Sequence, residues 1–244
     1  MDYKGLLHKI LFLDIETVPL NRSFDDLSVQ DKTLFEKKTR FQRKDNISPS
    51  EFYEKAGLWA EFGKIICIST VHVGKQEKGA EFILKSFYGH EEHQILNEFN
   101  TYLNQNFNSS SHLLCAHNGK EFDFPFLARR MIINQISLPD ILNLFGKKPW
   151  QIRHLDTMDL WKFGDYKHYT SLDLMTSVLR IPTPKTDLTG KDIRNVYYER
   201  QDLERIAAYC ERDAMCVLKV FLRLQGEFKR VNWTNSQEIV NDLI

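Results

Sequence analysis

Residues 10–16 read ILFLDIE, an apolar run that ends in two acidic side chains. Such a run predicts a buried β-strand, and Asp14 and Glu16 stand at its end. On a strand, positions i and i+2 share one face, so both carboxylates point to the same place. An Asp-x-Glu also occurs about once by chance in a chain of this length. On its own, the pair therefore favours a structural role over a catalytic one.

Outward from this strand, strand patterns give way to helical ones. Residues 65–73 and 81–88 are rich in β-branched and aromatic residues, which predicts two strands joined as an antiparallel hairpin. Residues 112–116 predict a fourth strand. Helical patterns cover residues 90–107, 125–134, 171–179 and 201–227. This order predicts an α/β fold in which a mixed sheet has helices on both faces.

The length of 244 residues suits one domain, and we expect residues 1–244 to form it. A polar insertion at about residues 20–60 follows the first strand, and its Ser48-Pro49-Ser50-Glu51 has the pattern of a capping box at a helix start. Residues 37–44 hold five cations and one aromatic residue. This stretch predicts either a solvated helix face or a grip on a nucleic acid strand.

Charge and cysteine content limit the class of protein and the cellular compartment to be expected. Lys plus Arg and Asp plus Glu both total 33, so the net charge is zero, which argues against a protein that coats nucleic acid by bulk charge. The four cysteines lie in apolar runs without the spacing of a zinc site. No apolar stretch approaches the ~18 residues of a membrane span, and no signal peptide pattern precedes the first strand. We therefore expect a cytoplasmic protein that makes no membrane contact.

A second acidic segment, HNGKEFDFPFL, covers residues 117–127. Asp123 comes two residues before Pro125, at the predicted start of a helix, where a capping role and a metal-binding role are both reasonable. Asn118 and Gly119 follow a predicted strand, so they fit a plain turn equally well.

A third segment, YCERD, covers residues 209–213 of the last predicted helix. Tyr209 and Asp213 are four residues apart and share one face of that helix. They border its apolar stripe, so they are able to face a cleft beside the core. A simple hydrogen bond between the two side chains explains the pair as well.

Together the three segments predict a metal-dependent hydrolytic site. Converging carboxylates supply the hard oxygen ligands that two divalent cations about 4 Å apart require. A tyrosine hydroxyl beside the attacking water is able to orient it without binding a metal. We therefore expect two Mg²⁺ or Mn²⁺ ions as cofactors.

The three segments resemble the Exo I, Exo II and Exo III motifs of the DEDD (DnaQ-like) superfamily of 3′–5′ exonucleases. The matching residues are Asp14 and Glu16 for Exo I, Asn118, Phe122 and Asp123 for Exo II, and Tyr209 and Asp213 for Exo III. The third motif has the tyrosine (DEDDy) form, since the histidine form would need His at the position of Ala208. The chain looks most like a stand-alone relative of the proofreading domain of family-B DNA polymerases, and is similar to predicted bacterial exonucleases.

This resemblance implies a ribonuclease H-like fold with a five-stranded mixed sheet. It also implies a role for each catalytic residue. Asp14 should bridge both metal ions, and Glu16 and Asp213 should bind the ion that activates water. Asp123 should hold the second ion, and Tyr209 should orient the attacking water.

Substrate contacts are expected at two places. The residues expected to bind substrate are Thr17, Asn118 and Phe122 beside the motifs, and Lys147, Lys148 and Trp150 in a later segment. In that segment, residues 146–168, cations alternate with aromatic side chains, which suits phosphates and stacked bases of a frayed single strand. Part of the segment, including Trp161 and Phe163, fits a core role as well.

The expected reaction is hydrolysis of phosphodiester bonds at the 3′ end of a nucleic acid, with release of nucleoside 5′-monophosphates. Single-stranded DNA is the favoured partner. An exoribonuclease with the same site is an alternative, because reading a 2′-hydroxyl depends on contacts that no motif reveals. A non-catalytic nucleic-acid-binding module is a second alternative, against which the intact set of four acids and a tyrosine argues.

Overall fold

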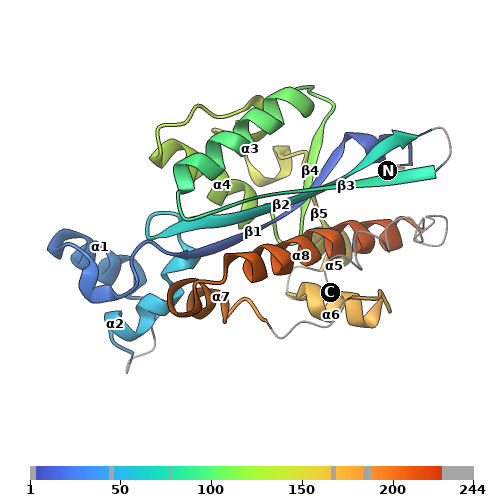
Figure 1. Cartoon of the computed structure of the whole chain (residues 1–244). Coiled ribbons are helices and arrows are strands. Elements are labelled where there is room, and N and C mark those ends of the chain that lie inside the picture. The colour runs from blue at the N-terminus through green and yellow to red at the C-terminus, as the bar shows by residue number, and fades with distance from the viewer. Residues whose placement is uncertain (1–3, 44–46, 77–78, 166–168, 184–187, 227–244) are drawn as a thin grey trace.

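The structure is a computed structural model that describes residues 4–43, 47–76, 79–165, 169–183 and 188–226. A five-stranded sheet lies between two layers of helices (Figure 1). The strands are β1 (Ile10–Pro19), β2 (Gly63–Gln76), β3 (Gly79–Tyr88), β4 (Leu113–Ala116) and β5 (Leu155–Asp156). The α-helices are α1 (Val29–Thr39), α2 (Pro49–Phe52), α3 (Glu92–Asn106), α4 (Asp123–Ile133), α5 (Thr157–Lys162), α6 (Leu172–Val178), α7 (Ile193–Asn195) and α8 (Leu203–Leu224). The expected α/β fold of ribonuclease H-like type is confirmed.

The strand that opens the sequence is the middle strand of the sheet. The order is β3-β2-β1-β4-β5, with β1, β2 and β3 antiparallel and β4 and β5 parallel to β1. Because β1 is covered on both faces, its residues are almost all buried. Leu11 and Leu13 pack under α3 and α4, whereas Ile10 and Phe12 pack against α8. This alternation turns Asp14 and Glu16 toward α8.

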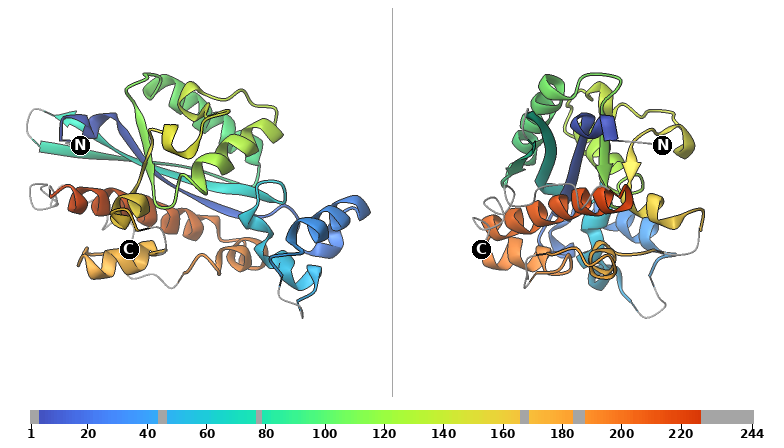
Figure 2. Two further views of the ribbon diagram at one scale, coloured as in Figure 1. Left: turned by 180° about the vertical axis from the view of Figure 1, so that it is seen from behind. Right: turned by 90° about the vertical axis from the view of Figure 1, so that its right-hand side faces the viewer.

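Two further views separate the layers clearly (Figure 2). The helices α3 and α4 cover one face of the sheet, and α8 runs along the other face with α6 beyond it. The apolar stripe of α8, which includes Val217 and Phe221, is fully buried against the sheet. The long helix therefore holds its third-motif residues at a fixed height above β1.

The insertion after β1 forms a small aromatic core of its own at one end of the sheet. The ring of Phe35 lies 5.2 Å from that of Tyr53 and 5.1 Å from that of Phe62, measured between centroids. The predicted capping box is confirmed, because Ser48 N–H donates to Glu51 Oε2 over 2.8 Å and Glu51 N–H donates to Ser48 Oγ over 3.2 Å. The insertion is therefore folded, and it lies next to the carboxyl end of β1.

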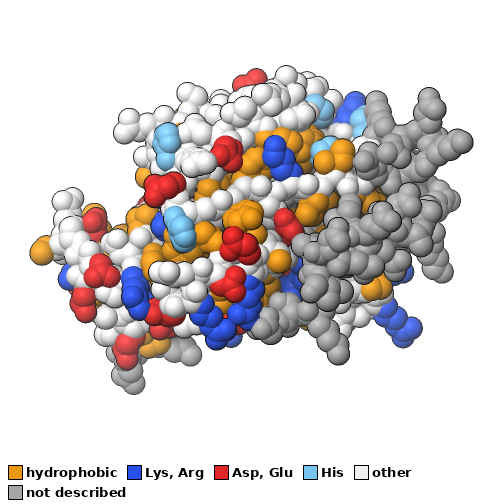
Figure 3. Space-filling model, viewed as in Figure 1, with side chains coloured by type: hydrophobic (Ala, Val, Ile, Leu, Met, Phe, Trp, Pro, Cys, Tyr) orange, Lys and Arg blue, Asp and Glu red, His pale blue; other side chains and the backbone are white. Residues whose placement is uncertain are grey.

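For the cationic stretch at residues 37–44, the structure is compatible with both predictions, a solvated helix face and a contact to a nucleic acid strand. Lys38 pairs with Glu61 over 2.9 Å, as on a solvated helix face, while Phe41 is 93% exposed. Lys44 lies outside the described residues. On the face that Figure 1 presents, acidic and basic side chains are interspersed (Figure 3).

Two details differ from the sequence-based expectation. No pattern indicated β5, which has only two residues and is therefore too short to show a period. The helix expected from residue 125 begins at Asp123, so this aspartate is part of α4 and not its cap.

Among the described residues, no helix combines the length and the hydropathy that a membrane span needs.

Candidate active site

The first two acids lie at an irregular place in the central strand. Glu16 is opposite Cys67 of β2, and the register shifts between Glu16 and Thr17. A bulge of this kind bends a strand and re-aims the side chains beside it. Thr17 itself donates from Oγ1 to the carbonyl oxygen of Gly57 over 2.8 Å, so the insertion fixes the strand just past the acids.

The third acid depends on a tight turn after β4. Asn118 has a φ of 63°, a left-handed conformation that Asn tolerates better than most residues. Gly119 is required by space, because a Cβ there would lie 2.4 Å from the Cβ of Ala116. The carbonyl oxygen of Asn118 accepts the N–H of Phe122 over 3.0 Å, and α4 follows at once. The turn thus places Asp123, only 3% exposed, at the start of α4.

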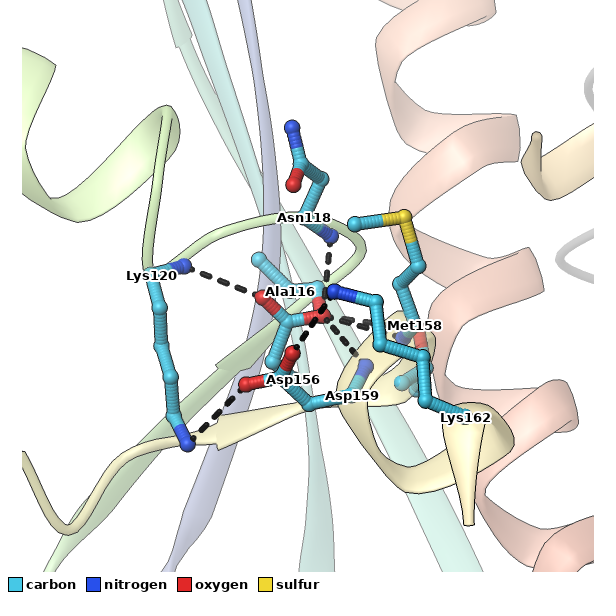
Figure 4. Close-up of polar contacts among 8 residues, drawn as sticks. Ala116, Asn118, Lys120, Asp156, Met158, Asp159 and Lys162 are labelled. Atoms are coloured by element: carbon cyan, nitrogen blue, oxygen red, sulfur yellow. Dashed lines mark hydrogen bonds and ion pairs between the residues drawn. The ribbon is translucent and has the colours of Figure 1, made fainter. Parts of the chain in front are cut away.

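Asp156 holds this turn from below (Figure 4). Its carboxylate accepts N–H groups from Asn118 over 2.9 Å, from Lys120 over 3.1 Å and from Met158 over 2.9 Å. The same side chain caps the start of α5. The sequence reasoning missed Asp156, although an aspartate directly before a helical stretch is a recognisable capping signal. Its hydrogen bonds to the backbone of the turn could not be predicted from the sequence, because Asp156 and the turn at Asn118 are far apart along the chain.

His117 ties the same turn to the segment before α6. Its Nδ1 lies 2.9 Å from Thr157 Oγ1, and its Nε2 lies 2.8 Å from the carbonyl oxygen of Thr170. A carbonyl only accepts hydrogen bonds, so Nε2 carries the proton and Nδ1 accepts from the threonine hydroxyl. Burial lowers the pKa of His117, which keeps the ring neutral. His117 is therefore a structural support of the turn.

The last two predicted residues stand on α8. Tyr209 is 9% exposed, and one helical turn later the side chain of Asp213 is 14% exposed. Arg212 lies between them: its Nε and Nη2 donate to Asp213 Oδ1 over 2.9 Å and 2.7 Å. Asp202 caps the start of α8 by accepting the N–H of Arg205 over 3.2 Å. A well-formed long helix thus brings both motif residues to the acids of β1.

The structure brings the four predicted acids together. Burial raises the pKa of Asp14 well above its usual value, and the carboxylates of Glu16, Asp213 and Asp123 raise it further. Burial likewise raises the pKa of Glu16, followed by the charge of Asp213. Burial also raises the pKa of Asp123 to about 8, which the nearby Asp156 reinforces. Burial raises the pKa of all four acids, and the neighbouring carboxylates raise those of Asp14 and Glu16 further, so the site is short of positive charge.

The donor atoms fit a hard divalent cation. Single ligand atoms of Asp14, Glu16 and Cys210 lie within 4.8 Å of one another. The Cys210 thiol donates to the backbone oxygen of Asp14 over 3.3 Å, and burial raises its pKa, so the sulfur stays protonated and is a poor ligand. The carboxylates of Asp123 and Asp213 stand outside this group of three. Asp213 is held there by Arg212, and the backbone of Ile15 contacts Asp123.

The residues expected to bind substrate separate into two groups. Asn118 and Phe122 belong to the turn beside the acids, and the buried Oδ1 of Asn118 has no hydrogen-bond partner among the residues that the structure describes. Lys147, Lys148 and Trp150 are not brought to the acids. Lys147 instead lines a cavity near the start of β4, and Lys148 Nζ lies 5.2 Å from the ring centroid of Trp150, which is 77% exposed.

That cavity has a volume of about 230 Å³ and lies at the amino ends of β4 and β5. Its charged lining residues are Asp140, Lys147 and Arg153. His154 on its wall is neutral, because burial lowers the pKa to about 4 and its two nitrogens bond the backbones of Leu114 and Ile141. The acids stand beyond the opposite ends of these strands.

Comparison with known proteins identifies a related family. The family model described as a predicted 3′–5′ exonuclease related to the exonuclease domain of PolB matches residues 58–244, which is more than half of the chain. The match includes Asp123, Tyr209 and Asp213, and it begins after Asp14 and Glu16. No curated protein matches the chain.

Proposed function

The chain belongs to the family of predicted 3′–5′ exonucleases related to the exonuclease domain of PolB, and from this membership we propose that it removes nucleotides stepwise from the 3′ end of a single nucleic acid strand. One observation carries the proposal. Acids from β1, α4 and α8 converge, each with a raised pKa, beside the buried Tyr209. Such a cluster is unfavourable without a counter-charge, which supports a metal-dependent reaction.

We assign the site to the tyrosine (DEDDy) subgroup, and two Mg²⁺ or Mn²⁺ ions fit its oxygen donors. Asp14 would bridge the ions, Glu16 and Asp213 would hold the first, and Asp123 would hold the second. The bulge after Glu16 and the turn before Asp123 support this assignment, because each fixes the backbone that carries an acid.

When bound, such ions lower the pKa of a water molecule and stabilise the charge on the leaving 3′ oxygen. Burial raises the pKa of Tyr209, so its hydroxyl stays neutral and is able both to donate and to accept a hydrogen bond. We propose that this hydroxyl orients the attacking water. The water attacks the last phosphodiester phosphorus, and the bond from phosphorus to the 3′ oxygen of the preceding nucleotide breaks. The products are a nucleoside 5′-monophosphate and a shortened strand that ends in a 3′-hydroxyl.

The proposed substrate is single-stranded DNA. Asn118 supports a contact to the terminal nucleotide, because its buried Oδ1 has no hydrogen-bond partner within the described part of the chain. Phe122 and Thr17 lie on the same turn and strand as the acids. Lys147, Lys148 and Trp150 would contact the strand only at a distance from the reacting bond.

The direct test compares 5′-labelled single strands of DNA and RNA of one sequence, with manganese, magnesium or excess chelator. A ladder of products that shortens from the 3′ end, present only with metal, is the expected result. The strand that is degraded faster identifies the substrate. Cutting of a circular single strand, or undiminished activity in chelator, would overturn the proposal.

Two further parts of the proposal concern the whole chain. Residues 1–244 would act as one exonuclease domain, since the insertion packs on β1 beside the acids through Thr17 and Gly57. The protein would work in the cytoplasm, which its four buried free cysteines support. Imaging of a fluorescent fusion would test the location.

A further inference from the structure

The cluster of acids includes a buried cation, Arg212, that the motif comparison did not single out. Arg212 has a side chain that is 9% exposed, and its Nε and Nη2 both donate to Asp213 Oδ1, over 2.9 Å and 2.7 Å. A buried arginine stays charged and donates in a fixed, planar geometry. Its position beside Asp213 is therefore well defined.

The same guanidinium contacts two other groups. Its Cζ lies 4.4 Å from the centroid of the Tyr209 ring, a cation–π contact. Its Nη2 lies 3.9 Å from Asp173 Oδ1, in the first turn of α6. Arg212 thus stacks on the proposed water-orienting tyrosine while it binds a proposed metal ligand.

Arg212 also partly offsets the shortage of positive charge. Its guanidinium lies within 2.9 Å of Asp213 Oδ1, so its positive charge stands directly beside the carboxylates of the site. A positive charge at this place has two opposite consequences. It makes the metal-free site less repulsive, and it weakens the attraction of the same carboxylates for divalent cations.

We propose that Arg212 is a positioning residue for the reaction proposed above. It fixes the Tyr209 ring and the Asp213 carboxylate, and by its charge it limits the affinity of the site for divalent cations. This inference rests on the proposed function only for its effect on turnover. Its effect on cation affinity is independent of any nucleic acid.

Two substitutions separate geometry from charge. Arg212→Lys keeps the charge but loses the planar stack and the paired donation. Arg212→Met keeps much of the length and loses the charge. Arg205→Met is the control, because it removes the same charge about 10 Å away along α8.

Manganese affinity, measured by calorimetry on the metal-free protein, is the first readout. We expect Arg212→Met to bind manganese roughly tenfold more tightly than the wild type, with Arg212→Lys and Arg205→Met close to wild type. A purely structural arginine would not tighten binding when removed. Unchanged or weaker binding by a folded Arg212→Met protein would overturn the charge part of the proposal.

Turnover at saturating manganese is the second readout. Both Arg212 variants should lose about 10–100-fold in kcat, the usual size for a residue that positions a ligand, whereas Arg205→Met should lose little. Melting curves identify any variant that fails to fold. If Arg212→Met does so, Arg212→Gln, which also lacks the charge, takes its place in the manganese titration, and Arg212→Lys still tests the positioning role. Wild-type kcat in a folded Arg212→Lys protein would overturn the positioning role. A wild-type protein that degrades no nucleic acid would refute the proposed function and leave the affinity result standing.

Discussion

The two ends of β4 differ in charge and in the rigidity of what they carry. Beyond its carboxyl end stand acids whose backbones are fixed by a bulge, a left-handed turn and the clamp of Asp156. At its amino end lies a cavity whose charged lining residues are two cations, Lys147 and Arg153, and one acid, Asp140, and Trp150, three residues after Lys147, is strongly exposed. We infer a division of tasks. Cleavage needs side chains that are held in place before substrate arrives, whereas contacts to a flexible strand tolerate exposed side chains.

The largest effect is expected at the acidic end, from Asp14→Asn. This substitution should reduce nuclease activity to the background of the assay, because it removes the carboxylate proposed to bridge both ions. The metal-free variant should melt at the same temperature as wild type or higher, since one repelling charge is gone and the shape is kept. Asp140→Asn, the same change in the cavity at the other end, should keep most of the activity. A clear drop in the metal-free melting temperature of Asp14→Asn would make Asp14 a structural residue.

The next largest effect distinguishes the roles of Tyr209 and Asp213, both at the acidic end. Tyr209→Phe should lower kcat by about 10–100-fold and leave manganese affinity nearly unchanged, because only an orienting hydroxyl is lost. Asp213→Ala should be worse in both respects, since it removes a proposed ligand. Single-turnover assays and metal titrations measure the two quantities. Equal activity and equal affinity in the two variants would contradict the proposed roles.

The acids also predict how the stability of the metal-free protein depends on pH. Burial raises the pKa of Asp123 to about 8, whereas in an unfolded chain it is near 4. Between these values the folded protein binds the extra proton, so its free energy of unfolding falls as pH rises toward about 8. Melting curves of the metal-free protein across this range should show the fall, and Asp123→Asn should flatten it.

Bound manganese should stabilise the protein, in contrast to the rise in pH, which destabilises the metal-free form. Bound to the native site, it should raise stability by roughly 2.7 kcal/mol at 100 times its dissociation constant. At one fixed manganese concentration, the gain should be larger at higher pH, because protons compete less for the acids and the dissociation constant is lower. The same gain in Asp14→Asn at the same manganese concentration would show that the ion binds elsewhere.

The smallest effect is expected at the basic end. Lys147→Ala should weaken binding of single strands a few-fold, equally for all sequences, and lower the salt dependence of binding by about one unit of slope. The kcat at saturating substrate should stay the same. Lys55→Ala, in the exposed insertion, serves as a charge control. If Lys147→Ala leaves both affinity and slope unchanged, this end of β4 does not contact the strand.

The acidic end was largely predictable from the sequence, and the reason is physical. An apolar run that ends in Asp14 and Glu16, and a helical stripe bordered by Tyr209 and Asp213, follow from the local periods of strand and helix. Both elements are found as expected. These patterns specify which face each side chain takes, and the sheet order then brings the faces together.

What the sequence could not reveal depends on contacts between distant segments. β5 has two residues, and the role of Asp156 appears only when it meets the backbone of Asn118 across the sheet. Arg212 lies inside a recognised motif. Its hydrogen bond to Asp213 and its cation–π contact with Tyr209 depend on the side-chain rotamer, which the sequence does not specify. Lys147 lies away from the acids because of the course of a loop, and a loop has no hydrophobic period from which its course could be predicted.

The middle position of β1 matters for anyone who clones a fragment of this gene. The family match begins at residue 58, and a gene fragment cut there would encode β2 to α8 without β1. Its product would lack the strand that pairs with both β2 and β4, so each of these strands would present an open edge. Open apolar edges pair with other chains. Such a fragment should collect in inclusion bodies, and adding residues 1–57 as a separate polypeptide during refolding should restore solubility if the strand alone is what it lacks.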